Sequence, residues 1–444
     1  MKHFVVKRFV LAVGLIFGAT LAQADIEIQQ VESPGGFDAW LVEEHAIPFV
    51  ALELRFKGGG SLDVEGKRGA TNLMASLLEE GAGDMDARGF AEAKEGIAAQ
   101  IGYDLNDDTL SISAKFLTET RDEGVDLLRA SIVDPAFDED SIERVRKQVL
   151  SGLASDATDP DKIVSRVFDG MVYGDHPYAT DYSGTLESVS ALTRDDIVEA
   201  WKNAIAKDRV VVSAAGDITA EELGALMDRL LSDLPDTGAP QPARVDVMTE
   251  AGVTVVPFDT PQSVAIFGHR GMKRNDPDFF AAYILNTIFG EGGFESRLMD
   301  EVREKRGLTY GVYSYLMPRD HAELVIGRVA SANDRVAEAV EVIKAEWAKV
   351  ASEGVTQQEL DDAKTYLTGA YPLRFDGNGP IAKILAGMQL DDLDPDYIKT
   401  RNANIEAVTL EGINRVASEL MKPDELAFVV VGQPVGLEAA NVGQ

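Results

Sequence analysis

The sequence predicts an α+β protein made of two tandem homologous domains, each a mostly antiparallel sheet packed with helices. A repeated pattern carries this prediction. Thr193 and Thr409 each open a helix, and a following apolar strand ends at Gly216 or Gly432. The same spacing, 216 residues, separates both pairs. Two further helices, 142–153 and 360–371, repeat at nearly that offset. Agreement between independent segments indicates duplication of one unit.

Within the first half, strands and helices follow one another in a readable order. Residues 49–56 partly alternate between apolar and polar side chains, as expected of a strand covered mainly on one face. Two helices are predicted next, then a strand at 109–116, then long amphipathic helices between 119 and 172. The two helices span residues 69–80 and 87–101. Helices on one side of an antiparallel sheet form an α+β layer.

The amino terminus has the pattern of a signal peptide. Lys2, Lys7 and Arg8 precede an apolar run over residues 9–19, and Ala22-Gln23-Ala24 forms a small-x-small cleavage site. The apolar run is roughly half the ~20 residues that span a bilayer. We therefore expect cleavage after Ala24 and a periplasmic protein with no membrane anchor.

The domain boundaries follow from a change in composition. A Pro- and Gly-rich stretch begins at Asp233 and interrupts both the helical and the strand periodicity. We divide the chain into a signal peptide at 1–24, a first domain at 25–232, a linker at 233–248 and a second domain at 249–444.

Composition excludes several classes of function. The chain has no cysteine, which excludes disulfides and thiolate metal sites. Its 75 acidic and 42 basic side chains give a net charge of −33, which argues against nucleic acid as a partner. The acidity is typical of a well-solvated surface, and attraction of basic substrates is the alternative.

A glycine-rich turn, 58–61, precedes the helix that contains Asn72, Ala75 and Ser76. This region resembles the zinc helix of M16 (pitrilysin/insulinase) peptidases, which carries an inverted H-x-x-E-H. There, two His at i and i+4 share a metal and the Glu activates its water. Here the corresponding positions are Asn72, Ala75 and Ser76, and counting back from Asp159-Pro160 places the family's third ligand at Gly152. The resemblance therefore implies an amphipathic scaffold helix with a degenerate zinc site.

The histidines do not offer a replacement metal site. Apart from His3 in the signal peptide, none lies within four residues of another. Each is expected to be hydrogen-bonded or to face solvent, and His176-Pro177-Tyr178 resembles a structural turn of the family. These four are His45, His176, His269 and His321. We expect this chain to bind no metal or other cofactor.

The most specific run lies in the second half, at residues 289–310. A glycine-rich turn leads into a helix near Glu295, Gly307 ends that helix, and residues 308–315 are predicted to form a strand. The run resembles the M16 pattern S-R-L-x-x-x-x-R-x-x-x-x-L-x-Y. By that resemblance, Arg303 and Tyr310 are the Arg/Tyr pair that faces the zinc. A phenol can donate to a peptide oxyanion, and a guanidinium can hold substrate carbonyls or a carboxylate.

The glycine-rich turn itself has two interpretations. It contains Gly290, Gly292 and Gly293 but no following G-K-[ST], so it is not a phosphate-binding P-loop. A substrate-binding loop and a tight turn that needs positive φ both remain open.

The resemblance, which covers essentially the whole mature chain, implies the non-zinc-binding subunit of a heterodimeric zinc peptidase. Such a chain is inactive alone and pairs with a homologous subunit that carries H-x-x-E-H and the zinc. It contributes peptide binding and oxyanion stabilisation to peptide hydrolysis. The alternative is a catalytically inactive scaffold or peptide-binding protein, which would have no reason to keep Arg303 and Tyr310. An independent enzyme ranks below both because the chain has no Ser-His or paired-carboxylate constellation. Sequence alone specifies neither the peptide, the partner nor the resting oligomer.

Overall fold

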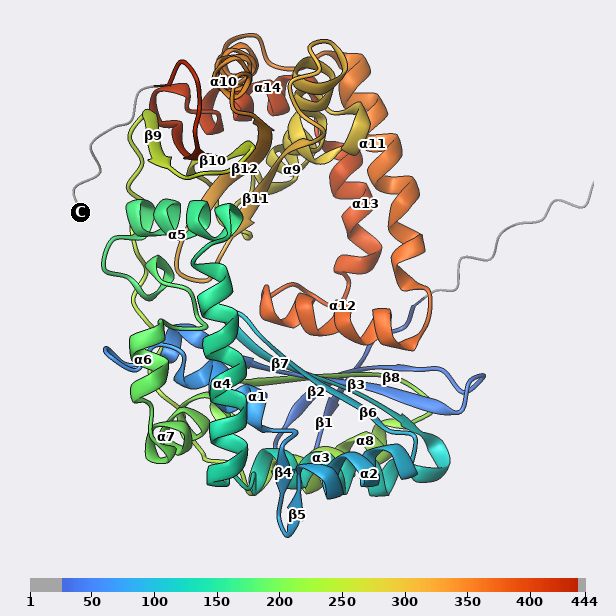
Figure 1. Ribbon diagram of the computed structural model, residues 1–444. Coiled ribbons are helices and arrows are strands. Elements are labelled where there is room, and N and C mark those ends of the chain that lie inside the picture. The colour runs from blue at the N-terminus through green and yellow to red at the C-terminus, as the bar shows by residue number, and fades with distance from the viewer. Residues whose placement is uncertain (1–25, 438–444) are drawn as a thin grey trace, which may run out of the picture.

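The computed structural model describes residues 26–437 and shows two halves of similar architecture (Figure 1). The predicted signal peptide and its cleavage site after Ala24 lie outside the described residues. The strands of the first sheet, coloured from blue to green, lie in the lower part of the picture, and those of the second, coloured from yellow-green to red, lie in the upper part. The predicted α+β architecture with tandem units is confirmed.

The first sheet has six strands in the order β1-β2-β8-β3-β7-β6. All neighbours are antiparallel except the parallel pair β2 and β8. The strand bounds are β1 Gln29–Glu32, β2 Asp38–Glu43, β3 Phe49–Lys57, β6 Gln100–Leu105, β7 Thr109–Leu117 and β8 Val210–Gly216. A short hairpin, β4 Gly81–Ala82 and β5 Met85–Asp86, lies apart.

The second sheet repeats this order with five strands, β11-β12-β10-β13-β9. Only β13 and β9 are parallel. The bounds are β9 Gly252–Pro257, β10 Gln262–Arg270, β11 Val312–Pro318, β12 Glu323–Ala332 and β13 Ala427–Gly432. Thus β6 and β11 are the corresponding edge strands of the two sheets.

Helices cover one face of each sheet and form the two main cores. Those of the first half are α1 Ala70–Leu77, α2 Ala87–Gly96, α3 Arg121–Val133, α4 Glu139–Asp156, α6 Leu186–Ala191, α7 Arg194–Ala204 and α8 Ala220–Leu231. Those of the second half are α9 Phe279–Asn286, α10 Val336–Glu353, α11 Gln357–Ala370, α13 Tyr397–Ala407 and α14 Leu410–Leu420. The predicted cap is confirmed at Thr193, whose side chain accepts from Asp196 N–H, and Thr409 caps α14 in the same manner.

The other face of each sheet is covered by a helix from the opposite half (Figure 1). Helix α5, Pro160–Tyr173, packs Val164 and Phe168 against the second sheet, while α12, Asn378–Leu390, packs Ala382 and Leu385 against the first. The Ser213 hydroxyl donates to the Ala382 carbonyl at 2.7 Å. Each half is therefore completed by the other.

The predicted linker has no helix or strand between α8 and β9. Its backbone is nevertheless held by both halves, because Met248 N–H donates to the Val172 carbonyl and Val245 N–H donates to the His321 carbonyl. Among residues 26–437, no helix is long and apolar enough to cross a membrane.

One predicted helix extended too far. Residues 87–101 were expected to be helical throughout, but α2 ends at Gly96 and Gln100 begins strand β6. Ala98 takes a positive φ of 53°, which turns the chain out of the helix. Ile101 is then paired with Ala114 of β7 and buried, so tertiary packing overrides the local helical preference. Strands β1 and β2 were not predicted.

Candidate functional site

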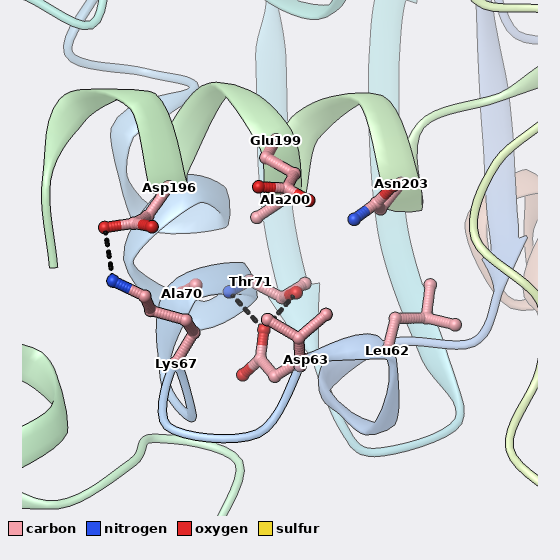
Figure 2. Close-up of a pocket in the computed structure, with 10 residues that line it drawn as sticks. Leu62, Asp63, Lys67, Ala70, Thr71, Asp196, Glu199, Ala200 and Asn203 are labelled. Carbon is pink, nitrogen blue, oxygen red and sulfur yellow. Dashed lines mark hydrogen bonds and ion pairs between the residues drawn. The ribbon is translucent and has the colours of Figure 1, made fainter.

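The start of α1 is fixed by a carboxylate that precedes it rather than by a cap on the helix itself. Asp63 accepts hydrogen bonds from Gly69 N–H at 2.7 Å, Thr71 N–H at 2.8 Å and the Thr71 hydroxyl at 2.7 Å. Figure 2 shows Asp63 beside Thr71, and Lys67 bonded to Asp196 of α7 at 3.0 Å. These contacts satisfy the first donors of α1 and hold it against α7.

Helix α1 has the amphipathic character that the sequence predicted. Leu73, Met74 and Leu77 are fully buried in the first core, whereas Ser76 is exposed and Asn72 half-buried. The polar side lines a cavity of about 480 Å³, which we call the helix-face cavity. Its walls are α1, the end of β6 and α4, with Asn72, Ala75, Ser76, Glu79, Glu80, Tyr103, Asp104, Leu105, Val145, Gln148, Val149 and Tyr182 lining it.

Several polar groups of the helix-face cavity are already engaged with the protein. The Ser76 hydroxyl donates to the Asn72 carbonyl at 2.9 Å, Glu79 pairs with Lys94 at 3.3 Å, and Glu80 pairs with Arg144. The cavity is polar and large enough for a side chain. Asn72, Ala75 and Ser76 contribute an amide, a methyl and a hydroxyl to its wall, whereas a zinc site would need imidazoles and a carboxylate.

A second cavity of about 680 Å³ lies on the opposite face of the same sheet, under α12, and we call it the α12-face cavity. On β3, alternate residues face it, because the intervening residues Leu52 and Leu54 point into the first core. It is lined by Phe49, Ala51, Glu53, Lys94, Ala99, Gln100, Ile101, Gly102, Ser113, Ala114, Lys115, Gly377, Asn378, Gly379, Pro380 and Lys383.

Strand β6 connects the two cavities. It forms the edge of the first sheet, with β7 as its only neighbour among the described strands. Tyr103, Asp104 and Leu105 line the helix-face cavity, and Gln100, Ile101 and Gly102 line the α12-face cavity. A sheet edge presents unpaired backbone N–H and C=O groups that an extended chain can bind. A strand added here would place alternate side chains over the two cavities.

The second-half segment forms a helix with π-helical geometry. A π-helical turn covers Thr287–Glu291, and another covers Met299–Glu304, where Lys305 N–H donates to the Asp300 carbonyl at 2.9 Å. Arg297 anchors the segment through both oxygens of Glu359, at 2.5 and 2.8 Å. Insertions of π geometry are frequent at functional sites.

Arg303 and Tyr310 lie on this segment with accessible side chains. The side chain of Arg303 is 31% exposed and pairs with Glu304 at 3.4 Å, and Tyr310 is 88% exposed. Gly307 ends the helix with a φ of 62°, and its N–H donates to the Arg303 carbonyl at 2.8 Å, as predicted for a C-terminal glycine.

The predicted strand 308–315 begins later than expected. Strand β11 starts at Val312, because the Thr309 hydroxyl binds the carbonyls of Gly311 and Ala330 and accepts from Gly311 N–H. This side-chain turn competes with the sheet ladder. Tyr310 therefore lies in an exposed turn before the strand, not within it.

Backbone geometry and close packing explain why the turn has glycine at positions 290, 292 and 293. A Cβ at Gly290 would lie 2.1 Å from the Ser314 Oγ, so Gly290 allows β11 to pack closely. Gly293 has a φ of 62° and open space around it. For Gly292, a Cβ would meet the Thr287 carbonyl at 2.5 Å. Close packing therefore explains Gly290 and Gly292, and of the three only Gly293 has the positive φ of the tight-turn interpretation. Substrate binding by the turn stays a prediction.

Comparison with known proteins agrees with this geometry. Residues 191–367 match the family model described as the peptidase M16 inactive domain. A Helicobacter pylori protein described as the non-peptidase homolog YmxG is 27% identical, with 97% of this chain and 98% of the relative covered. An uncharacterized zinc protease of Mycobacterium leprae is 28% identical over 80% of each chain. A crystal structure of a peptidase M16 inactive domain from Pseudomonas fluorescens aligns with a TM-score of 0.86 at 27% identity, covering 94% of this chain and all of the other.

Residues 191–367 thus match the peptidase M16 inactive domain, and nearly the whole chain is similar to M16 homologues in sequence and fold. The zinc that this similarity implies does not fit the residues of this chain. Asn72, Ala75 and Ser76 line the cavity where the resemblance places the ligands, but none is a zinc ligand of the usual type. Helix α4 contributes Val145, Gln148 and Val149, while Gly152, the predicted third position, lies further along the helix outside the cavity lining. Within residues 26–437, no three His, Cys, Asp or Glu side chains are grouped to hold a metal.

Three of the four histidines behave as predicted. His45 is exposed beside Asp217 at 2.8 Å, His176 caps the turn Pro177–Ala179 by accepting from Tyr178 N–H, and buried His269 accepts from the Trp347 indole at 3.0 Å. Burial lowers the pKa of His269 to about 4, so it is neutral. His321 differs from the prediction, because it is buried and its Nε2 has no partner among the described residues.

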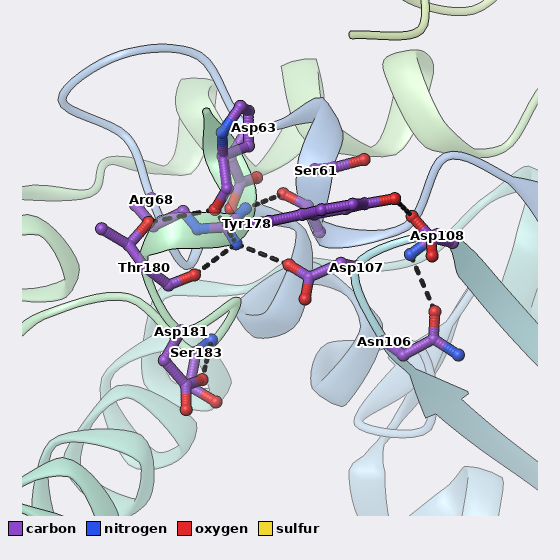
Figure 3. A network of polar contacts seen from close by, with 12 residues as sticks. Ser61, Asp63, Arg68, Asn106, Asp107, Asp108, Tyr178, Thr180, Asp181 and Ser183 are labelled. Carbon is purple, nitrogen blue, oxygen red and sulfur yellow. Dashed lines mark hydrogen bonds and ion pairs between the residues drawn. The ribbon is translucent and has the colours of Figure 1, made fainter. Parts of the chain in front are cut away.

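Sequence reasoning missed a network of polar side chains that joins the two halves of the chain. Arg319, in the turn between β11 and β12, forms ion pairs with Asp107 and Asp108 of the β6–β7 turn and stacks over the Tyr178 ring at 3.5 Å. Figure 3 shows Arg68 reaching Asp107, and the Tyr178 hydroxyl reaching Asp108. The network fixes the β6–β7 hairpin relative to the second half. The adjacent pair Asp107-Asp108 in a predicted turn gave no signal of a distant arginine.

Proposed function

We propose that this chain is the non-zinc-binding subunit of a heterodimeric M16 peptidase, in which it binds extended peptides along β6. The observation that carries the proposal is that β6 is an edge strand with a cavity on each face of the sheet. Asn72, Ala75 and Ser76 stand at the positions where the resemblance places the zinc ligands and the catalytic Glu. The fold of a zinc peptidase keeps room for a peptide there, whereas the groups that would activate water are missing.

Catalysis in the proposed complex requires a homologous partner that carries H-x-x-E-H and its zinc. The contribution of this chain would be a hydrogen bond from the Tyr310 phenol to the oxyanion formed at the peptide carbonyl, and guanidinium contacts from Arg303 to the substrate. The high exposure of Tyr310 supports this proposal, since a phenol that serves a partner chain must reach beyond its own core. The alternative is a peptide-binding homologue without a role in proteolysis, which the same cavities would also serve.

The signal-peptide pattern adds a location to the proposal. Both this chain and its partner would act in the periplasm, after removal of residues 1–24. No zinc or other cofactor would be held by this chain.

Peptide binding by the isolated chain tests the proposal. A short, acetylated and amidated extended peptide should bind without added metal, as measured by fluorescence anisotropy. Gly102→Leu should weaken binding by roughly tenfold, because a Cβ at Gly102 meets open space and a leucine would fill the α12-face cavity beside β6.

Gly152→Leu is the matched control. It introduces the same side chain into open space on exposed α4, outside both cavities, and should leave binding unchanged. If peptides of varied sequence fail to bind, or if both leucine variants bind as well as the unmodified chain, then β6 is not a peptide site.

A further inference from the structure

The α12-face cavity is lined by cationic groups although the protein as a whole is strongly acidic. Lys94, Lys115 and Lys383 line it, and Glu53 is its only acidic lining residue. Glu53 is 2% exposed, pairs with Arg55 at 2.5 Å and accepts a hydrogen bond from the Ser113 hydroxyl at 2.8 Å. Burial raises the pKa of Glu53, and the charges of Arg55 and Lys383 act on it in the opposite direction. In a chain of net charge −33, an excess of positive charge at one cavity is unusual and favours an anionic occupant.

Two of these lysines are not used by the protein as ion-pair partners. Lys94 bonds to Glu79 at 3.3 Å, but neither Lys115 nor Lys383 forms an ion pair with a residue in the described part of the chain. Lys115 lies with its ammonium 4.1 Å from the centre of the Phe49 ring, which holds it at the wall of the cavity. The two ammonium groups come from different halves, Lys115 from β7 and Lys383 from α12.

The first turn of α12 adds to the positive potential. Gly377, Asn378 and Gly379 line the cavity, the helix has no side-chain cap, and its first turn has no acidic residue. The helix dipole at this end therefore favours a negative group, in addition to the lysines.

The same cavity adjoins the backbone edge of β6. Gln100 and Gly102 face it, and Gly102 leaves open space where other residues would have a side chain. In a strand added to β6, every second side chain would point to this face of the sheet. A side chain of a peptide paired with β6 would therefore enter the α12-face cavity.

We propose that the α12-face cavity binds the carboxylate of an Asp or Glu side chain in an extended peptide paired with β6, with Lys115 and Lys383 as its partners. This inference rests on the proposed binding of peptides at β6 and assigns a substrate class to that site. Charge complementarity selects an acidic peptide over a neutral one, even though the net charge of the chain repels anions at long range.

The test compares two acetylated and amidated peptides that differ only in a central Glu or Gln, so that the side chain is the only carboxylate at issue. The unmodified chain should bind the Glu peptide roughly tenfold more tightly, as expected of charge-assisted hydrogen bonds. In the double variant Lys115→Gln with Lys383→Gln, this preference should fall to within about twofold, while the Gln peptide should bind as before.

Lys147→Gln with Lys273→Gln is the control with the same change in net charge. Both lysines are exposed, lie outside the cavity lining and form no ion pair with a described residue, so the Glu preference should persist. The proposal would be overturned if the Lys115/Lys383 variant preferred the Glu peptide over the Gln peptide as strongly as the unmodified chain does. It would also be overturned if the unmodified chain showed no such preference. In either case, binding of the Gln peptide and its loss in Gly102→Leu would still support peptide binding at β6, so the two proposals fail separately.

Discussion

Asn72 and Ser76 lie one helical turn apart on the side of α1 that borders the helix-face cavity. The resemblance to the M16 zinc helix identified both positions, and the i, i+4 spacing then places them on one face of the helix without knowledge of the rest of the fold. Gly152 was placed by counting back from a turn, and it lies beyond Gln148 and Val149, which reach the cavity. Counting along a chain fails where the register of one helix against another decides which residue faces inward.

Tyr310→Phe tests the role of a single hydroxyl. The substitution removes one donor from a side chain that is 88% exposed, so stability and assembly should not change. Turnover of the reconstituted heterodimer should fall by roughly 10²–10³ with a smaller change in KM, because the bond matters most in the transition state. Steady-state kinetics measures the effect, with size-exclusion chromatography as the folding control. Unchanged turnover in an intact complex would assign this segment to architecture.

Asp169 on α5 makes stability depend on pH. Burial, together with the charges of Asp107 and Asp181, raises its pKa to about 7 against the opposing charge of Arg319. Between about pH 4 and 7 the native state therefore keeps a proton that the unfolded chain has released, and the free energy of unfolding falls as pH rises. Asp169→Asn should reduce this fall, measured as the difference in Tm between pH 5 and pH 8.

Asp175→Asn, on an exposed residue just beyond α5, is the control for the change in charge and should keep the pH dependence of the unmodified chain. Burial raises the pKa of Asp320 to about 6. Asp320 is present in the unmodified chain and in both variants, so its contribution to the pH dependence of Tm is the same in all three. A Tm difference in Asp169→Asn equal to that of the unmodified chain would show that this carboxyl does not titrate in that range.

Elements whose pattern repeats locally were predictable, and elements defined by distant partners were not. The strand at Phe49–Lys57 and the helix α1 follow from their own periodicity. The first two residues of β6, Gln100 and Ile101, were expected to end a helix, since their pairing with β7 is not visible in their own sequence. The edge strand and the α12-face cavity could therefore not be predicted from the sequence, because the edge depends on the sheet and the cavity on the distant α12.

The turn between β11 and β12 offers a test of the junction between halves. Arg319→Met should lower the free energy of unfolding by about 3 kcal/mol, because Asp107 and Asp108 would lose a partner in a largely buried site. Urea denaturation measures the change. Arg270→Met removes a pair with Asp246 in which both side chains are more than half exposed, and should cost less than about 1 kcal/mol. Similar losses in both variants would mean that the junction contributes no more than a surface ion pair.

At the scale of the whole molecule, the duplication was visible from the sequence because the spacing between Thr193 and Thr409 equals that between Gly216 and Gly432. The exchange of α5 and α12 between the halves was not, since adjacent elements are expected to pack together. This exchange makes each sheet depend on the other half. It also places α12, with Lys383, over the first sheet and so builds the α12-face cavity from both repeats.

Mixing this chain with a zinc-bearing M16 homologue, and measuring the hydrolysis of a quenched fluorescent peptide, tests the central claim most directly. We predict no hydrolysis by this chain alone, because Asn72, Ala75 and Ser76 stand where metal and base would be needed. The mixture should cleave the peptide faster than the zinc-bearing chain alone, and the gain should follow formation of the complex by size-exclusion chromatography. A complex that forms without any gain in rate would contradict the account, as would chelator-sensitive proteolysis by the purified chain alone.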